Sequence, residues 1–186
     1  MVLRALRWAD FEALVDIYWA LYDEREEDSS VGIHLFAERP TRDGEVEWFS
    51  SLFQKVLRGE TIFVVAEEDG RAVGSCAIGS ASPGGLPSET SHVGVLGILI
   101  DRNYRGRGIG TALLVKALDE ARGRFDRVRL GVFASNDRAR RLYERVGFRL
   151  TGRLVGEVKR GDRYIDEDLM TLDLRSWVPP LLPPSG

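Results

Sequence analysis

The chain has 186 residues, a length suited to one domain, and is 44% hydrophobic and 30% charged. These fractions are typical of a globular protein, no apolar run is long enough to cross a membrane, and the N-terminus lacks the form of a signal peptide. The single cysteine, Cys76, excludes an intrachain disulfide, so we expect it to be a small buried side chain in a cytoplasmic protein.

The net charge of −3 is unevenly distributed along the chain. The segment from Arg102 to Arg149 carries a balance of +8, and the rest carries −11. Such asymmetry indicates an anionic ligand on one half of the protein, although solvated helix faces explain most of these charges. A nucleic-acid binder is the other interpretation of the basic half. It is disfavoured because the whole chain is acidic and has no recognisable nucleic-acid-binding motif.

The first half of the chain alternates between helical and strand patterns. Apolar spacing predicts a strand over Val2–Arg7 and helices over Ala9–Tyr22 and Gly44–Leu57, with a solvated acidic segment, "DEREEDSS", after the first helix. Two β-rich runs joined at Asp69-Gly70 predict a hairpin. A long loop, "SASPGGLPSETS", should follow the hairpin.

The second half should complete a single mixed sheet. We expect a central strand over His92–Ile100, a helix over Ile109–Arg124, a central strand "VRLGVF", a short helix within "SNDRARRLYERVGF", and two closing strands, Phe148–Val158 and Tyr164–Leu174. The order β-α-α-β-β-β-α-β-α-β-β predicts an α/β fold with helices on both faces of the sheet. We expect one domain over residues 1–178 and a proline-rich tail over 179–186.

A glycine-rich segment, "RGRGIG", separates the central strand from the following helix. Glycine lets the backbone approach a ligand, and a helix N-terminus offers unpaired N–H groups to an anion. The segment is neither a P-loop nor a G-x-G-x-x-G motif, because the required Lys-Ser/Thr and glycine spacing are missing. The alternative for these glycines is tight packing of the helix on the sheet.

The second conspicuous motif is "NDRARRLYERVGF". Tyr143 follows Asn136 by seven residues, about two helical turns along one face, and Ala139 lies between them. Alone, this pattern is typical of a capping asparagine and a core tyrosine.

Together the two motifs resemble the GCN5-related N-acetyltransferase (GNAT) superfamily. Its acyl-CoA signature, R/Q-x-x-G-x-G/A, is matched by Arg105, Gly108 and Gly110. Its second motif is matched by the set Asn136, Ala139, Leu142, Tyr143, Gly147 and Phe148. The C-terminal pattern around Asp166 and Met170 resembles the subgroup that acetylates small amines or protein N-termini. The resemblance implies a mixed, twisted sheet of about seven strands with about four helices and splayed central strands.

The resemblance also implies a binding site for acetyl-CoA, with no metal. Its cofactor-binding residues would be Ile98, Leu99, Ile100, Arg105, Gly106, Arg107, Gly108, Ile109, Gly110, Thr111, Asn136, Ala139, Arg140 and Tyr143. The loop amides would hold the pyrophosphate, the Ile98 backbone N–H would polarise the thioester carbonyl, and Tyr143 would protonate the leaving thiolate. The family also allows a homodimer.

A general base is not evident on the central strand, which has no acidic residue. His92 at its start is the tentative base, with Glu89 just before it. Glu157 and Asp166 on the closing strands, or a water relay, are alternatives. Acyl transfer through Cys76 is disfavoured because nothing nearby in sequence would activate its thiol.

We therefore expect an N-acetyltransferase that transfers acetyl from acetyl-CoA to a primary amine by direct attack in a ternary complex. The alternative is a non-catalytic acyl-CoA-binding module on the same fold. Partners should be a small-molecule or peptide amine, with neither nucleic acid nor membrane. The sequence leaves the acceptor amine open.

Overall fold

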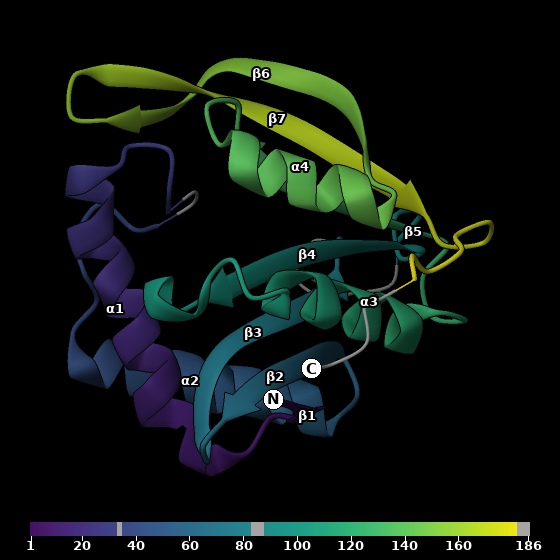
Figure 1. Ribbon diagram of the computed structural model, residues 1–186, viewed down its shortest axis with the longest axis horizontal. Helices are drawn as coiled ribbons and strands as arrows, with labels where there is room; N and C mark the ends of the chain where they lie inside the picture. Colours follow the sequence, from purple (N-terminus) through teal and green to yellow (C-terminus); the bar gives the residue numbers. More distant parts are fainter. Residues whose placement is uncertain (33–34, 83–87, 182–186) are drawn as a thin grey trace.

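A computed structural model describes residues 1–32, 35–82 and 88–181 of the chain. Its centre is one mixed sheet of seven strands in the order β1-β2-β3-β4-β5-β7-β6 (Figure 1). The strands are β1 (Val2–Ala5), β2 (Thr61–Glu68), β3 (Arg71–Ser80), β4 (Val93–Ile100), β5 (Arg127–Phe133), β6 (Arg149–Arg160) and β7 (Arg163–Asp173). Among the strands of the described residues, only β4 and β5 pair in parallel. The predicted mixed seven-stranded sheet is confirmed.

In the described part of the chain, four α-helices cover the two faces of the sheet (Figure 1). They are α1 (Phe11–Glu27), α2 (Arg42–Leu57), α3 (Ile109–Ala121) and α4 (Asp137–Val146). On one face α3 and α4 pack on the larger core, which includes Leu113, Leu118 and Val146. On the other face α1 and α2 pack on a smaller core around Phe49, which is fully buried. The structure therefore separates two compartments, one on each side of the sheet.

The hairpin of β2 and β3 forms at the predicted turn. Asp69 and Gly70 both have positive φ, +50° and +77°, as a two-residue hairpin turn requires. The predicted loop after this hairpin includes residues 83–87, which lie outside the described residues, as do 182–186 of the tail.

The acidic segment after the first predicted helix differs from the expectation of a solvated stretch. Helix α1 continues through it to Glu27, and Glu24 is buried, 8% exposed. Glu24 is placed there by an ion pair with Arg105, which lies just before α3. A partner distant in sequence therefore extends the helix beyond the apolar pattern.

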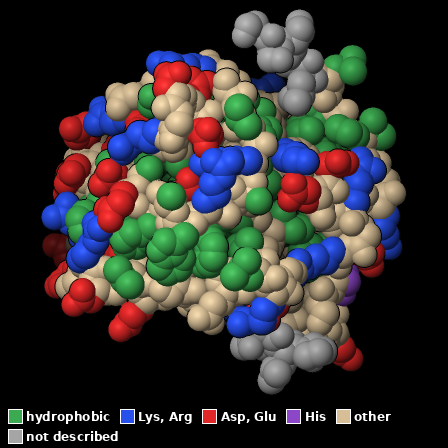
Figure 2. All heavy atoms as spheres, turned by 90° about the horizontal axis from the view of Figure 1, so that it is seen from below, with side chains coloured by type: hydrophobic (Ala, Val, Ile, Leu, Met, Phe, Trp, Pro, Cys, Tyr) green, Lys and Arg blue, Asp and Glu red, His purple; other side chains and the backbone are tan. Residues whose placement is uncertain are grey.

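The outer surface mixes charged and apolar side chains. Figure 2 shows hydrophobic side chains exposed among charged ones on one face. Exposed large hydrophobic residues include Trp8, Trp48 and Leu57. Within the described ranges, none of the helices combines the length and apolar character needed to span a membrane. The homodimer stays a prediction.

Candidate active site

The two central strands separate after a short paired stretch. β4 and β5 are in register only from Val93 with Arg127 to Val95 with Arg129. Beyond these pairs the strands diverge, as predicted, and a cavity of about 570 Å³ opens. Ile98 and Ile100 line it from β4, and Gly131 and Phe133 from β5. The splay thus opens a passage through the sheet.

The backbone of β4 presents alternate residues to this cavity. Ala81 N donates to Val93 O at 2.9 Å, and Asp101 N donates to Val73 O at 3.0 Å. In an antiparallel ladder the hydrogen-bonding direction alternates, so odd-numbered residues of β4 point their backbone groups toward β3. The backbone N–H and C=O of Ile98 therefore point toward the cavity, whereas those of Leu99 point toward β3.

The three glycines before α3 serve two different needs. Gly106 and Gly108 both have φ of +83°, a left-handed conformation that favours glycine. A Cβ at Gly110 would instead lie 2.9 Å from Leu142 Cδ2 and 3.1 Å from Ile100 Cδ1. Gly110 therefore fits the packing interpretation, whereas a phosphate contact at Gly106 and Gly108 stays a prediction that their left-handed backbone permits.

The start of α3 offers unpaired donors beside the cavity. The first hydrogen bond into the helix runs from Ala112 N to Gly108 O at 3.1 Å. The preceding amides, 109–111, are the ones that a helix N-terminus leaves without an intrahelical acceptor. Gly108, Gly110 and Thr111 line the cavity. The loop and helix end together form a cradle suited to an anion.

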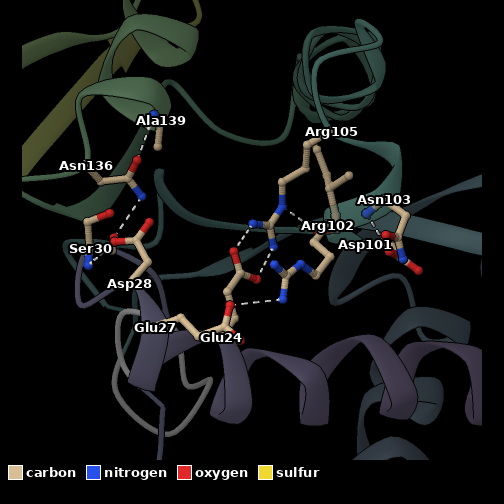
Figure 3. A network of polar contacts seen from close by, with 11 residues as sticks. Glu24, Glu27, Asp28, Ser30, Asp101, Arg102, Asn103, Arg105, Asn136 and Ala139 are labelled. Carbon is tan, nitrogen blue, oxygen red and sulfur yellow. Dashed lines mark hydrogen bonds and ion pairs between the residues drawn. The ribbon is translucent and has the colours of Figure 1, made fainter.

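Arg105, the first arginine of the glycine-rich segment, is held by other groups of the protein. Arg105 Nε donates to Ile100 O at 3.0 Å, and its Nη2 donates to Glu24 at 2.8 Å (Figure 3). Arg105 thus connects β4, the loop and α1. Its side chain sets the position of the cradle, while the loop backbone remains available to a ligand.

Arg138 lies beside the cradle. Its Nη2 lies 3.8 Å from the position of a Cβ on Gly106, and it lines the cavity, as does Arg145. Of the predicted cofactor-binding residues, Arg107, Ile109 and Arg140 do not line it. Arg107 donates to Asn103 O at 2.9 Å, and Arg140 donates to Ala134 O at 3.2 Å. Arg138 was not among the residues predicted from the sequence, although its place in the first turn after Asn136 was the available signal.

Asn136 caps α4 and holds the loop after α1. Its Oδ1 accepts from Ala139 N at 3.0 Å, and its Nδ2 donates to Ser30 O at 3.0 Å (Figure 3). Asn136 and Ala139 both line the cavity. The amide retains a second N–H and a second lone pair for a ligand.

Tyr143 lies in the cavity wall and is nearly buried, 7% exposed. Its ring packs edge-on against Phe148 at 5.9 Å between centroids. Burial, with a smaller contribution from nearby Cys76, raises the pKa of the hydroxyl far above its usual value. Tyr143 therefore stays protonated and can donate a hydrogen bond or a proton.

The tentative base is not near these groups. His92 is exposed at the start of β4, six residues before Ile98, or about 20 Å along the strand. Glu157 and Glu89 are exposed, and Asp166 accepts a hydrogen bond from Gly156 N at 2.9 Å. None of the four lines the cavity. The predicted proton acceptor is thus not brought together with Tyr143.

Comparisons with known proteins point to one family. The model of the acetyltransferase (GNAT) family matches residues 11–148. L-amino acid N-acyltransferase MnaT of Escherichia coli is 25% identical over 183 residues, 94% of each chain. L-amino acid N-acetyltransferase AaaT of the same organism is 32% identical over 78 residues. That match spans 41% of this chain and about half, 48%, of the relative.

A solved structure shares the fold along almost the whole chain. It is yncA from Salmonella typhimurium with its cofactor acetyl-CoA, 21% identical, with a TM-score of 0.77. The alignment covers 97% of this chain and 98% of that one.

Proposed function

The chain belongs to the acetyltransferase (GNAT) family, and from that membership we infer an N-acetyltransferase that uses acetyl-CoA as its acetyl donor. We propose further that it transfers the acetyl group directly to a primary amine within a ternary complex. The observation that carries the proposal is that one cavity is lined by the anion cradle, by Tyr143 and by the backbone of Ile98.

The residues at the cavity fit acetyl-CoA. The left-handed glycines and the amides at the start of α3 suit a pyrophosphate. Arg138 adds a positive charge beside them. The backbone edge of β4 at Ile98, which β5 leaves unpaired, suits the amide groups of the pantetheine arm. Acetyl-CoA would supply an activated thioester to this edge.

In the proposed reaction the amine nitrogen bonds to the thioester carbonyl carbon and the carbon–sulfur bond breaks. The Ile98 N–H stabilises negative charge on the carbonyl oxygen as the tetrahedral intermediate forms. Tyr143 donates its proton to the leaving sulfur and regains one from the acceptor nitrogen through solvent. The high pKa of Tyr143 keeps it protonated until thiolate forms.

The proposed acceptor is the α-amino group of an L-amino acid. Two relatives, MnaT and AaaT, are named for L-amino acids, and MnaT aligns along nearly the whole chain. The C-terminal resemblance to acetyltransferases of small amines and protein N-termini supports the same chemical class, a primary amine. An N-terminal peptide is the alternative acceptor.

An acceptor screen tests the proposal. Thiol release from acetyl-CoA is measured with the twenty L-amino acids, short peptides and polyamines. Turnover should be greatest with an L-amino acid. Turnover with peptides alone would contradict the acceptor class, and tight CoA binding without any turnover would favour the non-catalytic binding module.

A further inference from the structure

A buried carboxylate, Glu167 on β7, lies against the β5 wall of the cavity. A Cβ added to Gly131 would lie 1.8 Å from Glu167 Oε1 and 2.8 Å from its Cδ. Gly131 lines the cavity, and Glu167 is 4% exposed. The absence of a side chain at Gly131 therefore leaves the carboxylate as the group directly behind that part of the wall.

Glu167 belongs to the face of the sheet opposite α3. Val128, Leu130 and Val132 of β5 point into the core under α3 and α4, so Gly131 and Phe133 point to the other face. Glu167 is the cross-strand partner of Phe133 and shares its face. The anion cradle and Tyr143 belong to the α3 and α4 side. Glu167 therefore lies behind the β5 wall of the cavity, on the face of the sheet opposite the cradle and Tyr143.

The acidic residues that do line the cavity lie away from its β5 wall. Glu24 holds Arg105 and so belongs to the cradle (Figure 3). Asp28 accepts from Ser30, and these hydrogen bonds hold its pKa below the usual value, which makes it a weaker base. Asp137 lies 3.6 Å from Arg140 in the first turn of α4. Glu167 does not itself line the cavity, but its carboxylate lies directly behind Gly131 of the β5 wall, on the side away from the cradle.

We propose that Glu167 receives the acceptor amine and removes its proton before attack, an inference that rests on the proposed acetyl transfer. The acceptor enters as an ammonium ion from the face opposite α3. A proton passes from its nitrogen to a Glu167 oxygen, which leaves the nitrogen lone pair free to bond to the thioester carbon. The protonated Glu167 then releases the proton to solvent. A buried carboxylate suits this role because its attraction for a cation is only weakly screened.

Glu167→Gln tests the proposal against the unaltered protein, using the most active L-amino acid of the screen and its methyl ester. The kcat/KM for the free amino acid should fall about 100-fold, the usual effect of losing a general base. The loss should be clearly smaller with the ester, because its amine gives up a proton more readily. The KM for acetyl-CoA and the thermal shift that CoA induces should not change.

Gly131→Ala provides a second variant that keeps the carboxylate and displaces it. The new Cβ would overlap Oε1, so kcat/KM for the amine should fall again. Glu47→Gln, an exposed glutamate on α2, and Gly152→Ala, where a Cβ meets nothing within 4 Å, are the matched controls and should behave as the unaltered protein.

Three outcomes would overturn the role of Glu167. They are full kcat/KM in Glu167→Gln, an equal loss with amino acid and ester, or a parallel loss of the CoA-induced thermal shift, which would indicate a structural role. No turnover by the unaltered protein with any amine would instead refute the proposed function itself, and the role of Glu167 with it.

Discussion

Tyr143 combines burial with a place in the cavity wall. It is 7% exposed, and burial raises its pKa. A group with so high a pKa is a poor acid toward water, but a thiolate formed late in the reaction needs only one positioned proton. The proposed role of Tyr143 as the general acid therefore depends on the position of its hydroxyl against the sulfur.

Replacing Tyr143 by Phe should lower kcat about 100-fold, the size of a lost general acid. The ring packing on Phe148 is retained, so the CoA-induced rise in melting temperature should persist. Steady-state rates and thermal melts check the two halves of this prediction. Undiminished kcat would remove the acid role.

Arg138 and Arg107 provide a matched pair near the glycine loop. Arg138 lines the cavity, whereas Arg107 stacks on Tyr104 at 5.0 Å and donates to Asn103 O. Arg138→Gln should raise the KM for acetyl-CoA about tenfold, since one charge-assisted hydrogen bond contributes roughly 1.5–3 kcal/mol. Arg107→Gln should change it little. The reverse ranking would support the cofactor contact that the sequence predicted for Arg107.

Cavity residues that contribute their backbone were easier to predict from the sequence than residues that contribute a side chain. Glycines at fixed spacing indicated the cradle because backbone conformation is a local property. The direction of an arginine depends on partners distant in sequence, such as Glu24 for Arg105. Glu167 was missed because its relation to Gly131 exists only once β5 and β7 pair.

The C-terminal end of α1 fixes the loop before α3. Glu24 and Arg105 are largely enclosed, with side chains 11% and 20% exposed. A neighbouring pair, Glu27 and Arg102, is open to solvent at 65% and 55%. The enclosed pair should therefore hold the loop, whereas the open pair should contribute little.

Glu24→Gln should lower the free energy of unfolding by about 1.5–3 kcal/mol and weaken CoA binding. Glu27→Gln should cost at most about 1 kcal/mol, as exposed ion pairs do. Denaturant unfolding and CoA titration measure both effects. Equal costs in the two variants would show that Arg105 does not position the cradle.

Element types were predictable because apolar spacing and turn chemistry are local. The ends of the elements were less so. Helix α1 continues beyond the predicted end at Tyr22 because Glu24 finds Arg105. The predicted helix over Ile109–Arg124 ends at Ala121.

At the scale of the molecule, one buried carboxylate connects the first strand to the first helix. Asp10 is 5% exposed and accepts two hydrogen bonds from Arg4 and one from the Arg7 amide. Burial alone would raise its pKa, but these bonds outweigh burial and the net pKa is lowered. A lowered pKa stabilises the fold above the unfolded value, and this stability disappears as the pH falls through the folded value.

The melting temperature should therefore fall as the pH drops below about 4, near the unfolded aspartate pKa. The Asp10→Asn variant should have a lower melting temperature than the unaltered protein at neutral pH. Its melting temperature should fall less on acidification. Asp16→Asn, whose carboxylate is exposed on α1, should follow the unaltered curve. Parallel curves for Asp10→Asn and the unaltered protein would contradict the assignment.

The overall fold was predictable because the order of elements restricts how they can pair, and the splay followed from the family resemblance. We propose that this splay brings acetyl-CoA and an amine together for direct transfer. Initial rates with both substrates varied test it most directly. We expect double-reciprocal lines that intersect, as a ternary complex requires. Parallel lines, the pattern of a covalent acetyl-enzyme, would contradict it.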